Sequence, residues 1–414
     1  MDFIVLLTNS GIGRPIYGYL SIHIQFAKKL QISPMIKVGV AGSGNLEVVI
    51  KPNSDFDKTD IIVNTVISGF RNTWDAVIVR FVEDYPYGGL SITLNDAGAT
   101  PPVVSLRLRQ AMETYQTGYP KKDSYTEANA RTRIYSLVDE TSFTEFLLEK
   151  ETPSPTLPQL NMQVETDDGV IVGIAKMDGV DIAIASQQKD FIGGSVGEIH
   201  GAKINGLIKY AIKHQLPAII FLIDSGGVRL QEANVGEIEI SEIIRSILDA
   251  RSAGIKTIGV ICGNNGAFGG MGIISGTLDY LIVNQGARIG ISGAEVIQAV
   301  KGVEVFDSSN RPLVWRVYGG RTRFLKDDVQ GYTTNKTMDI RQAIKTALKT
   351  LSTTPSLSLN SILAEHEQLQ KRITSAKNCR EEGEWLKNNR PELYQQDIFS
   401  VSDQQFLELT NKGK

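Results

Sequence analysis

The sequence has few cysteines and histidines. Only Cys262 and Cys379 occur among 414 residues, and neither has a neighbouring cysteine or histidine at metal-ligand spacing. This scarcity argues against both a disulfide scaffold and a zinc site, and it predicts the cytosol as the compartment. The four histidines form no serine–histidine–carboxylate pattern that indicates nucleophilic catalysis. We therefore expect a site that works without a metal and without a catalytic triad.

A strong excess of one charge and a long hydrophobic run are also lacking. The formal net charge is −3, which argues against nucleic-acid binding as the main function. The run Phe3–Leu7 is too short to span a bilayer and follows Asp2 rather than basic residues. It therefore predicts neither a transmembrane helix nor a secretory signal, and no stable membrane insertion. The length favours two or three domains, and a hydrophobic content of 42% is enough for buried cores.

The most informative stretch is an apolar run followed by a glycine-rich loop. Residues 218–223 are all apolar, which is typical of a strand covered on both faces in a layered α/β fold. Asp224-Ser225-Gly226-Gly227 follows, and a helix pattern comes next. Ligands bind at the carboxyl ends of such strands, and glycines let backbone N–H groups approach a ligand oxygen. The alternative for a single loop of this kind is an ordinary turn at a helix start.

Two further glycine-rich segments recur at the spacing of strand–helix units. Phe191 to Glu198 precedes one helix pattern, and Gly263 to Met271 follows the apolar strand at residues 257–262. Three such junctions can converge on one acyl group. We expect oxyanion-type N–H donors at Gly226, Gly227, Gly269 and Gly270, and cofactor binding at Gly193, Gly194, Ser195 and Arg229. For Arg229, a structural ion pair beside the helix start is the alternative.

These motifs together resemble the carboxyltransferase family with the crotonase-like fold, and most closely the β subunit of biotin-independent malonate decarboxylase. The resemblance extends from about residue 124 to about residue 331 and rests on Phe191–Gly197, Gly227–Asn234, Phe268–Met271, Ala287–Gly290 and Gly293–Ile297. It implies a domain of repeated ββα units. It also implies enolate stabilisation as a malonyl thioester loses carbon dioxide, which is carbon–carbon lyase chemistry.

The N-terminal part has the pattern of a small α+β domain. Val38 and Val40 alternate into Gly42-Ser43-Gly44-Asn45, and alternation resumes after it, which predicts a hairpin. Strands at residues 60–66 and 90–94 and two helices should follow, the first capped by Asn72 and the second by Thr100. The glycines at 39, 42 and 44 are not a dinucleotide fingerprint, because strand periodicity rather than a helix follows them.

This domain resembles the acyl-carrier (delta) subunit of malonate decarboxylase. The matching residues are Val40–Val48, Asn95–Pro101, Val104, Leu106–Leu108 and Gln110. The resemblance implies that Ser43 carries 2'-(5''-phosphoribosyl)-3'-dephospho-coenzyme A through its hydroxyl. Where the family has an aspartate after the second glycine, this chain has Asn45.

We therefore expect an α/β protein with an uncertain extension at 1–34, an acyl-carrier domain at 35–118, a linker at 119–125, and a crotonase-like domain at 126–414 with a helical C-terminal tail. This organisation is that of a natural fusion of delta and beta subunits. It implies three partners: a second crotonase-like (gamma) decarboxylase subunit, an acetyl-S-carrier:malonate transferase (alpha) subunit, and an enzyme that transfers the prosthetic group. Neither biotin nor a metal is implied.

Two other functions stay open at this point. An acyl-CoA carboxylase carboxyltransferase would need a biotin partner, which a Ser43 carrier domain in the same chain makes redundant. A non-catalytic carrier and docking subunit would not need the glycine-rich junctions that the sequence retains.

Overall fold

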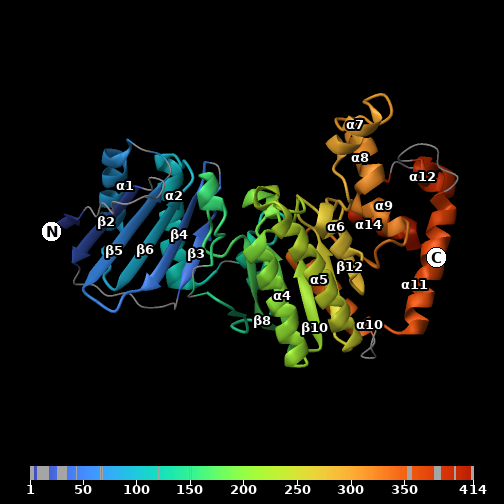
Figure 1. Ribbon diagram of the computed structural model, residues 1–414, viewed down its shortest axis with the longest axis horizontal. Coiled ribbons are helices and arrows are strands. Elements are labelled where there is room, and N and C mark those ends of the chain that lie inside the picture. The colour runs from blue at the N-terminus through green and yellow to red at the C-terminus, as the bar shows by residue number, and fades with distance from the viewer. Residues whose placement is uncertain are drawn as a thin grey trace. The chain divides into compact units, whose positions relative to one another are not determined.

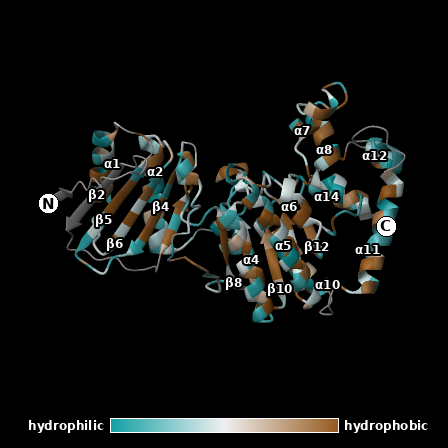
Figure 2. Ribbon diagram, viewed as in Figure 1, coloured by the Kyte–Doolittle hydropathy of each residue, from teal (hydrophilic) through white to brown (hydrophobic). Residues whose placement is uncertain are grey.

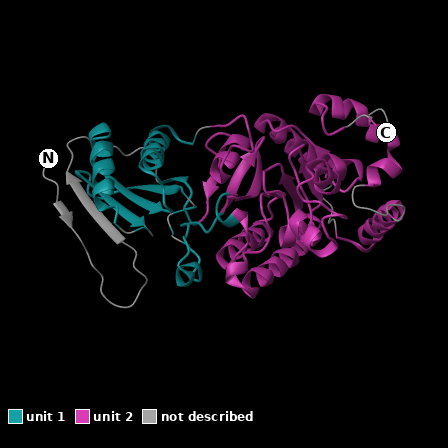
Figure 3. Cartoon of the chain, turned by 90° about the horizontal axis from the view of Figure 1, so that it is seen from above, with its two compact units in different colours: residues 1–120, 147–169, 190–192 teal, residues 121–146, 170–189, 193–414 magenta. Residues whose placement is uncertain are grey.

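The protein forms two compact units in this computed structural model (Figure 3). The structure describes residues 4–6, 18–25, 35–42, 44–65, 67, 69–119, 121–148, 150, 152–351, 357–376, 384–395 and 398–411. Unit 1 comprises residues 1–120, 147–169 and 190–192, and unit 2 comprises residues 121–146, 170–189 and 193–414. Ser43, the predicted attachment residue, lies outside the described residues.

Unit 1 is built on a six-stranded sheet (Figure 1). In spatial order the strands are β1 (Ile4–Leu6), β2 (Gly18–Gln25), β5 (Lys58–Thr65), β6 (Leu90–Asp96), β4 (Leu46–Pro52) and β3 (Ile36–Gly39). Neighbours are antiparallel except β5 and β6, which are parallel. Helices α1 (Arg71–Asp84) and α2 (Pro101–Thr117) pack their apolar sides on the sheet and complete one core.

Most of the predicted elements of unit 1 are confirmed. Strands β3 and β4 pair as the predicted hairpin, and Thr100 is the residue before α2. The predicted start of α1 is wrong by two residues, since the helix begins at Arg71 after Phe70 and Asn72 lies inside it. Residues 1–34 had no predicted role, yet β2 pairs with β5 over eight residue pairs. The sheet is therefore larger than the hairpin and two further strands that the sequence predicts.

Two segments far along the sequence also pack in unit 1. The Ala41 N–H donates to the Glu165 carboxylate at 3.2 Å, and buried Val40 clusters with Leu157 and Phe191. These contacts explain why residues 147–169 and 190–192 group with the carrier sheet. A single boundary at residues 119–125 does not describe them.

Unit 2 is built on a seven-stranded sheet. Its order is β13 (Gly331–Tyr332), β12 (Tyr280–Val283), β11 (Lys256–Ile261), β10 (Ala218–Leu222), β9 (Val180–Gln187), β8 (Val170–Met177) and β7 (Thr144–Glu145). Strands β9 to β13 are parallel, whereas β7 and β8 are antiparallel additions. The β8–β9 hairpin turns at Asp178 and Gly179, both with positive φ, a conformation that the Asp-Gly pair favours in a two-residue turn.

Helices cover both faces of this sheet. Helices α4 (Glu198–Lys213) and α5 (Asn234–Ser252) pack on one face, while α3 (Ala130–Leu137) and α10 (Thr337–Thr350) pack on the other. Every residue of β10 is buried, which confirms the inference drawn from its unbroken apolar run. Figure 2 shows the central strands of unit 2 mainly in brown, the colour of hydrophobic residues.

The remaining α-helices of unit 2 come after β11, β12 or β13 in the chain. They are α6 (Gly269–Ser275), α7 (Ala294–Lys301), α8 (Arg311–Tyr318), α9 (Gly320–Leu325), α11 (Leu359–Ala376), α12 (Trp385–Asn389), α13 (Pro391–Gln395) and α14 (Asp403–Asn411). A small core joins α9 to the C-terminal segments through Leu325, Leu386 and Phe406. No helix in the described ranges combines the length and hydrophobicity that a bilayer crossing requires.

Candidate active site

Four strand–helix junctions of unit 2 pair edge to edge. We call the loops that follow β9, β10, β11 and β12 the β9 to β12 junctions. Isolated parallel bridges join Val196 to Val228, Ser225 to Ala267, and Ala267 to Ile289. The glycine-rich segments that the sequence singled out therefore converge at the carboxyl ends of neighbouring parallel strands. A fourth junction, after β12, completes the set.

The β10 and β11 junctions meet at two glycines. A Cβ on Gly227 would lie 3.1 Å from the Phe268 carbonyl oxygen, and a Cβ on Gly269 would lie 3.3 Å from the Gly227 Cα. Both glycines have positive φ, of 122° and 53°. Close backbone contact and left-handed conformation both favour glycine here.

Three of the four predicted N–H donors already bind groups of the protein. The Gly226 N–H donates to the Gly193 carbonyl at 2.9 Å, the Gly227 N–H to the Ser225 hydroxyl at 3.1 Å, and the Gly269 N–H to the Ile291 carbonyl at 3.0 Å. The Gly270 N–H has no partner among the residues that the structure describes. Of the four predicted donors, Gly270 is therefore the one that could donate to a ligand without losing a bond to a described residue.

Sequence reasoning missed a second candidate donor, Val228. Its N–H also has no partner within the described ranges, although both neighbouring residues of the β10 junction are engaged in the bridge to Val196. The Val228 nitrogen lies 3.9 Å from the position of a Cβ on Gly269. It therefore lies near the same meeting point of the two junctions, although no side-chain pattern marks it.

A cavity of about 870 Å³ opens beside these junctions. Its walls include Gly193 from the β9 junction, Gly226 from the β10 junction, and Gly269 from the β11 junction. Helices α7 and α8 contribute further lining residues, including Arg311 and Trp315. One space thus touches a predicted glycine from each of the three predicted junctions.

Two arginines give this cavity a cationic wall that sequence reasoning did not assign. Burial, followed by the Arg311 cation, lowers the pKa of Arg288 below its ordinary value. The Arg288 guanidinium lies 5.5 Å and the Arg311 guanidinium 5.8 Å from the Trp315 ring centre. Arg288 belongs to Ala287–Gly290, one of the segments that carry the family resemblance, and this was the sequence feature that could have identified it. Two neighbouring cations with an aromatic wall favour an anionic ligand.

Arg229, predicted to bind the cofactor, is instead fully buried in an ion pair. Its Nη1 donates to Glu232 at 2.9 Å, and its Nη2 donates to the Ser195 carbonyl at 3.3 Å. Glu232 also accepts from the Glu198 N–H at 2.6 Å, at the start of α4. These contacts favour the structural alternative for Arg229, and they tie the β9 and β10 junctions together.

The predicted cofactor-binding glycines of the β9 junction differ in their surroundings. A Cβ on Gly194 would lie 2.1 Å from the Asp224 carbonyl oxygen, so close packing accounts for this glycine. A Cβ on Gly193 would meet no atom within 4 Å, and Gly193 lines the cavity. Ser195 is buried and its carbonyl accepts from Arg229. Gly193 is thus the residue of this predicted set that faces a possible ligand.

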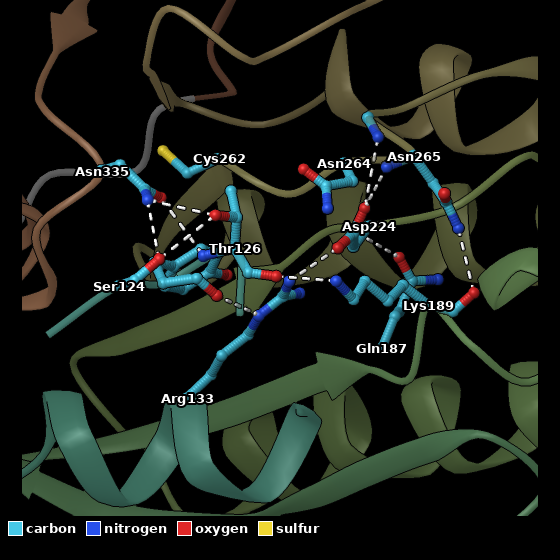
Figure 4. A network of polar contacts seen from close by, with 12 residues as sticks. Ser124, Thr126, Arg133, Gln187, Lys189, Asp224, Cys262, Asn264, Asn265 and Asn335 are labelled. Carbon is cyan, nitrogen blue, oxygen red and sulfur yellow. Dashed lines mark hydrogen bonds and ion pairs between the residues drawn. The ribbon is translucent and has the colours of Figure 1, made fainter. Parts of the chain in front are cut away.

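A buried polar network holds the β10 and β11 junctions in place (Figure 4). Arg133 of α3 donates to the Asp224 Oδ2 at 2.7 Å. The Asp224 Oδ1 accepts from the N–H groups of Asn265 and Gly266, at 2.6 and 3.3 Å. The Asn265 side chain in turn donates to the Lys189 carbonyl. One carboxylate therefore links three of the four junctions to α3, directly or through Asn265.

Two family models match the chain. Residues 34–115 match the malonate decarboxylase delta subunit, and residues 124–375 match the carboxyl transferase domain. The malonyl-S-ACP:biotin-protein carboxyltransferase of Malonomonas rubra is 36% identical over 220 residues, which are 50% of this chain and 69% of that protein.

The N-terminal part has relatives of its own. The malonate decarboxylase acyl carrier protein of Stenotrophomonas maltophilia is 44% identical over 86 residues, which are 21% of this chain and 81% of that protein. A chain of the Pseudomonas malonate decarboxylase hetero-tetramer solved with malonate aligns with a TM-score of 0.56 and 32% identity, covering 62% of this chain and 92% of that one. The protein therefore belongs to the carboxyl transferase family and carries, in the same polypeptide, the acyl-carrier (delta) domain of malonate decarboxylases.

Proposed function

We propose that this chain carries the acyl group and releases carbon dioxide in a malonate decarboxylase. The reaction converts a malonyl thioester and a proton into an acetyl thioester and carbon dioxide, which makes the chain a carbon–carbon lyase acting with partner subunits. The observation that carries the proposal is the presence of a malonate decarboxylase carrier domain and a carboxyl transferase domain in one chain.

Membership of the carrier family implies a covalently attached prosthetic group. We assign it to Ser43 as 2'-(5''-phosphoribosyl)-3'-dephospho-coenzyme A, whose thiol supplies the thioester linkage. The described residues around position 43 fit such a group. Gly44 has a φ of 73°, and a Cβ there would meet no atom within 4 Å, so the turn has open space beside it.

Decarboxylation of a malonyl thioester requires unit 2 to stabilise an enolate. As the bond between the carboxylate carbon and the methylene carbon breaks, its electron pair moves toward the thioester oxygen, and carbon dioxide leaves. The Val228 and Gly270 N–H groups, which have no partners within the described ranges, are our donors for that oxygen. Removing one such donor costs about 100- to 1,000-fold in rate in comparable sites.

The cavity walls suit the rest of such a substrate. Arg288 and Arg311 offer cations to the anionic groups of a coenzyme A-like arm, since guanidinium groups bind phosphate oxygens in pairs. Phe268 and Trp315 add apolar surface that limits the access of water to the reacting thioester.

The chain is expected to act within an assembly. The similar Pseudomonas protein was solved as a hetero-tetramer. We propose a second crotonase-like (gamma) subunit and an acetyl-S-carrier:malonate transferase (alpha) subunit as partners, and a separate enzyme that attaches the prosthetic arm. Helix α7 offers a surface for such a partner. None of its residues is buried, and the side chains of Val296 and Val300 are 52% and 79% exposed.

A second candidate function is carboxyl transfer from a malonyl thioester to a biotin protein. The observation that favours it is the 36% identity to the Malonomonas rubra protein, whose name describes that reaction. In both cases the same bond breaks and the same enolate forms. The two functions differ only in whether the carboxyl group leaves as carbon dioxide or is passed to biotin.

Isotope tracing separates the two functions. The chain, assembled with its partner subunits, is supplied with malonate labelled in both carboxyl groups, with and without a biotin carrier protein. We expect labelled carbon dioxide at the same rate in both mixtures. Release of carbon dioxide only when the biotin protein is present, with label found on that protein, would establish the second function instead.

A further inference from the structure

Arg107 of α2 is held beside the predicted attachment turn by two neutral side chains. Its Nε donates to the Asn45 Oδ1 at 2.9 Å, and its Nη1 donates to the Gln110 Oε1 at 2.8 Å. The Asn45 Oδ1 also accepts from the Leu46 N–H at 2.9 Å. These bonds orient the guanidinium without neutralising its charge.

The Arg107 charge has no ion-pair partner within 4 Å among the described residues. Its Nη2 likewise has no hydrogen-bond partner in the described ranges. Burial lowers the pKa of Arg107 below its ordinary value, and the charge of the exposed Asp190 opposes that effect. A partly desolvated arginine whose hydrogen-bond partners are neutral gains more from a paired anion than a fully hydrated one.

The expected anion is close in sequence to Asn45, which orients this arginine. Asn45 is two residues after Ser43. Because consecutive Cα atoms are about 3.8 Å apart, the Cα atoms of these two residues are at most about 8 Å apart. Position 45 carries the uncharged amide of an asparagine. A carboxylate at position 45 would pair with Arg107 directly, whereas the amide holds its orientation and leaves its charge available.

We propose that Arg107, oriented by Asn45 and Gln110, binds the phosphodiester that links the prosthetic arm to Ser43. This inference rests on the proposed function, because it requires an arm attached through a phosphodiester. It assigns Arg107 a ligand-binding role. It also explains why an uncharged amide suits position 45, since a carboxylate there would pair with Arg107 in place of the phosphate. The paired phosphate fixes the first bonds of the arm and leaves its distal thiol free to move.

The test compares arm-loaded and unloaded full-length chain. Intact-protein mass establishes loading, and two readouts follow: the ³¹P chemical shift of the phosphodiester and the change in Tm on loading. In the wild type we expect a higher Tm after loading, because an anion that binds only the folded state stabilises it, and a phosphorus shift that moves with salt. Arg107→Gln should remove the gain in Tm and give the shift of a free phosphodiester.

Three further variants sharpen the result. Arg109→Gln removes an exposed arginine from the same helix and should behave as the wild type. Arg107→Lys keeps a cation but loses the two-bond orientation, so it should retain part of the gain in Tm. Asn45→Asp keeps Arg107 but supplies a competing carboxylate, so it should reduce both effects. If the transferring enzyme fails to attach the arm to the Arg107→Gln variant, the readouts of the Asn45→Asp variant decide the test instead.

Two results would overturn the inference, and they differ from each other. Wild-type values of both readouts in loaded Arg107→Gln and Asn45→Asp would show that the phosphodiester does not bind Arg107, while the carrier function would stand. A wild-type chain that gains no mass on exposure to the transferring enzyme would remove the carrier function, and this inference with it.

Discussion

Arg133 and Asp224 form an ion pair in which both side chains have 0% exposure, with an Nη2–Oδ2 distance of 2.7 Å. The other carboxylate oxygen of Asp224 accepts two N–H groups of the β11 junction. The pair therefore connects α3 to the backbone that forms the cavity wall. A Cβ on Gly263 would lie 2.0 Å from Asp224 Oδ2, so the junction is built closely around this carboxylate.

We expect Asp224→Asn to destabilise unit 2 strongly. The amide keeps the shape, but its NH₂ must face either the Arg133 guanidinium or the two N–H donors, and Arg133 keeps an unpaired buried charge. Breaking a buried pair in this way costs about 3–5 kcal/mol. Denaturant unfolding measures the change. Glu242→Gln, which breaks the exposed pair with Arg245, is the control and should leave stability unchanged within error.

Substitutions at Gly226 and Gly270 should have different effects, the first on activity and the second on stability. A Cβ on Gly226 would make only an ordinary contact, 3.6 Å from the Gly193 carbonyl, and Gly226 lines the cavity. Gly226→Val should therefore stay folded, with a stability loss of about 1 kcal/mol or less. Displacing the acyl group by about 1 Å should lower the decarboxylation rate about 100-fold. Full activity in a folded Gly226→Val variant would remove this cavity from the mechanism.

Gly270 behaves differently because its Cβ would point at α5. That atom would lie 2.5 Å from the Ile240 Cγ1, so Gly270→Ala should cost about 1–3 kcal/mol through overpacking. Ile240→Ala removes the Cγ1, Cγ2 and Cδ1 atoms that crowd the added methyl, so Gly270→Ala should cost much less in that background than in the wild type. Thermal unfolding of Gly270→Ala, Ile240→Ala and the double variant is the measurement. An equal cost of Gly270→Ala in both backgrounds would mean that Ile240 is not the obstacle.

Glu47 predicts a pH dependence of unit 1. Burial, followed by the Asp167 charge, raises the pKa of the Glu47 carboxyl above its ordinary value of 4.5. The folded state then binds this proton more tightly than the unfolded state, so the resulting stability is complete below pH 4.5 and is lost as pH rises through the raised pKa. Glu47→Gln cannot lose a proton. Its unfolding free energy relative to the wild type should therefore increase as pH rises above 4.5, and a constant difference would contradict this assignment.

Helix α7 predicts where a partner subunit binds. Val300 is 79% exposed, so Val300→Asp should leave the isolated chain folded and equally stable. In the proposed complex it would bury an unpaired charge, so the Kd for the second crotonase-like subunit should rise at least about tenfold. Val180→Asp, at another exposed valine of unit 2, is the matched control. Unchanged affinity in Val300→Asp would exclude α7 from that interface.

Local patterns in the sequence predicted the elements that carry the site. The apolar run at 218–223 identified a fully covered strand, and its glycine-rich loop lies where such loops bind ligands. The alternation around Gly42-Ser43-Gly44-Asn45 likewise identified the pairing of β3 with β4. Each of these features depends on residues adjacent in sequence, so periodicity and turn chemistry are enough to find them.

The features that sequence analysis missed depend on contacts between distant residues. Glu165 reaches Ala41 across 124 positions, and nothing local in residues 147–169 marks them as part of the carrier unit. The burial of Arg229 with Glu232 and the engagement of the Gly226 N–H by Gly193 are likewise properties of the folded chain. Backbone donors such as Val228 have no side-chain signature at all.

The most direct test of the central claim uses one Ser43→Ala preparation in two assays. The substitution removes the proposed attachment atom, so malonate turnover by the assembled complex should fall to background. Malonyl-coenzyme A, or a separately added charged carrier, should still be decarboxylated, because the glycine junctions belong to another unit, although without the local concentration of a tethered arm. Undiminished malonate turnover by Ser43→Ala would contradict the account.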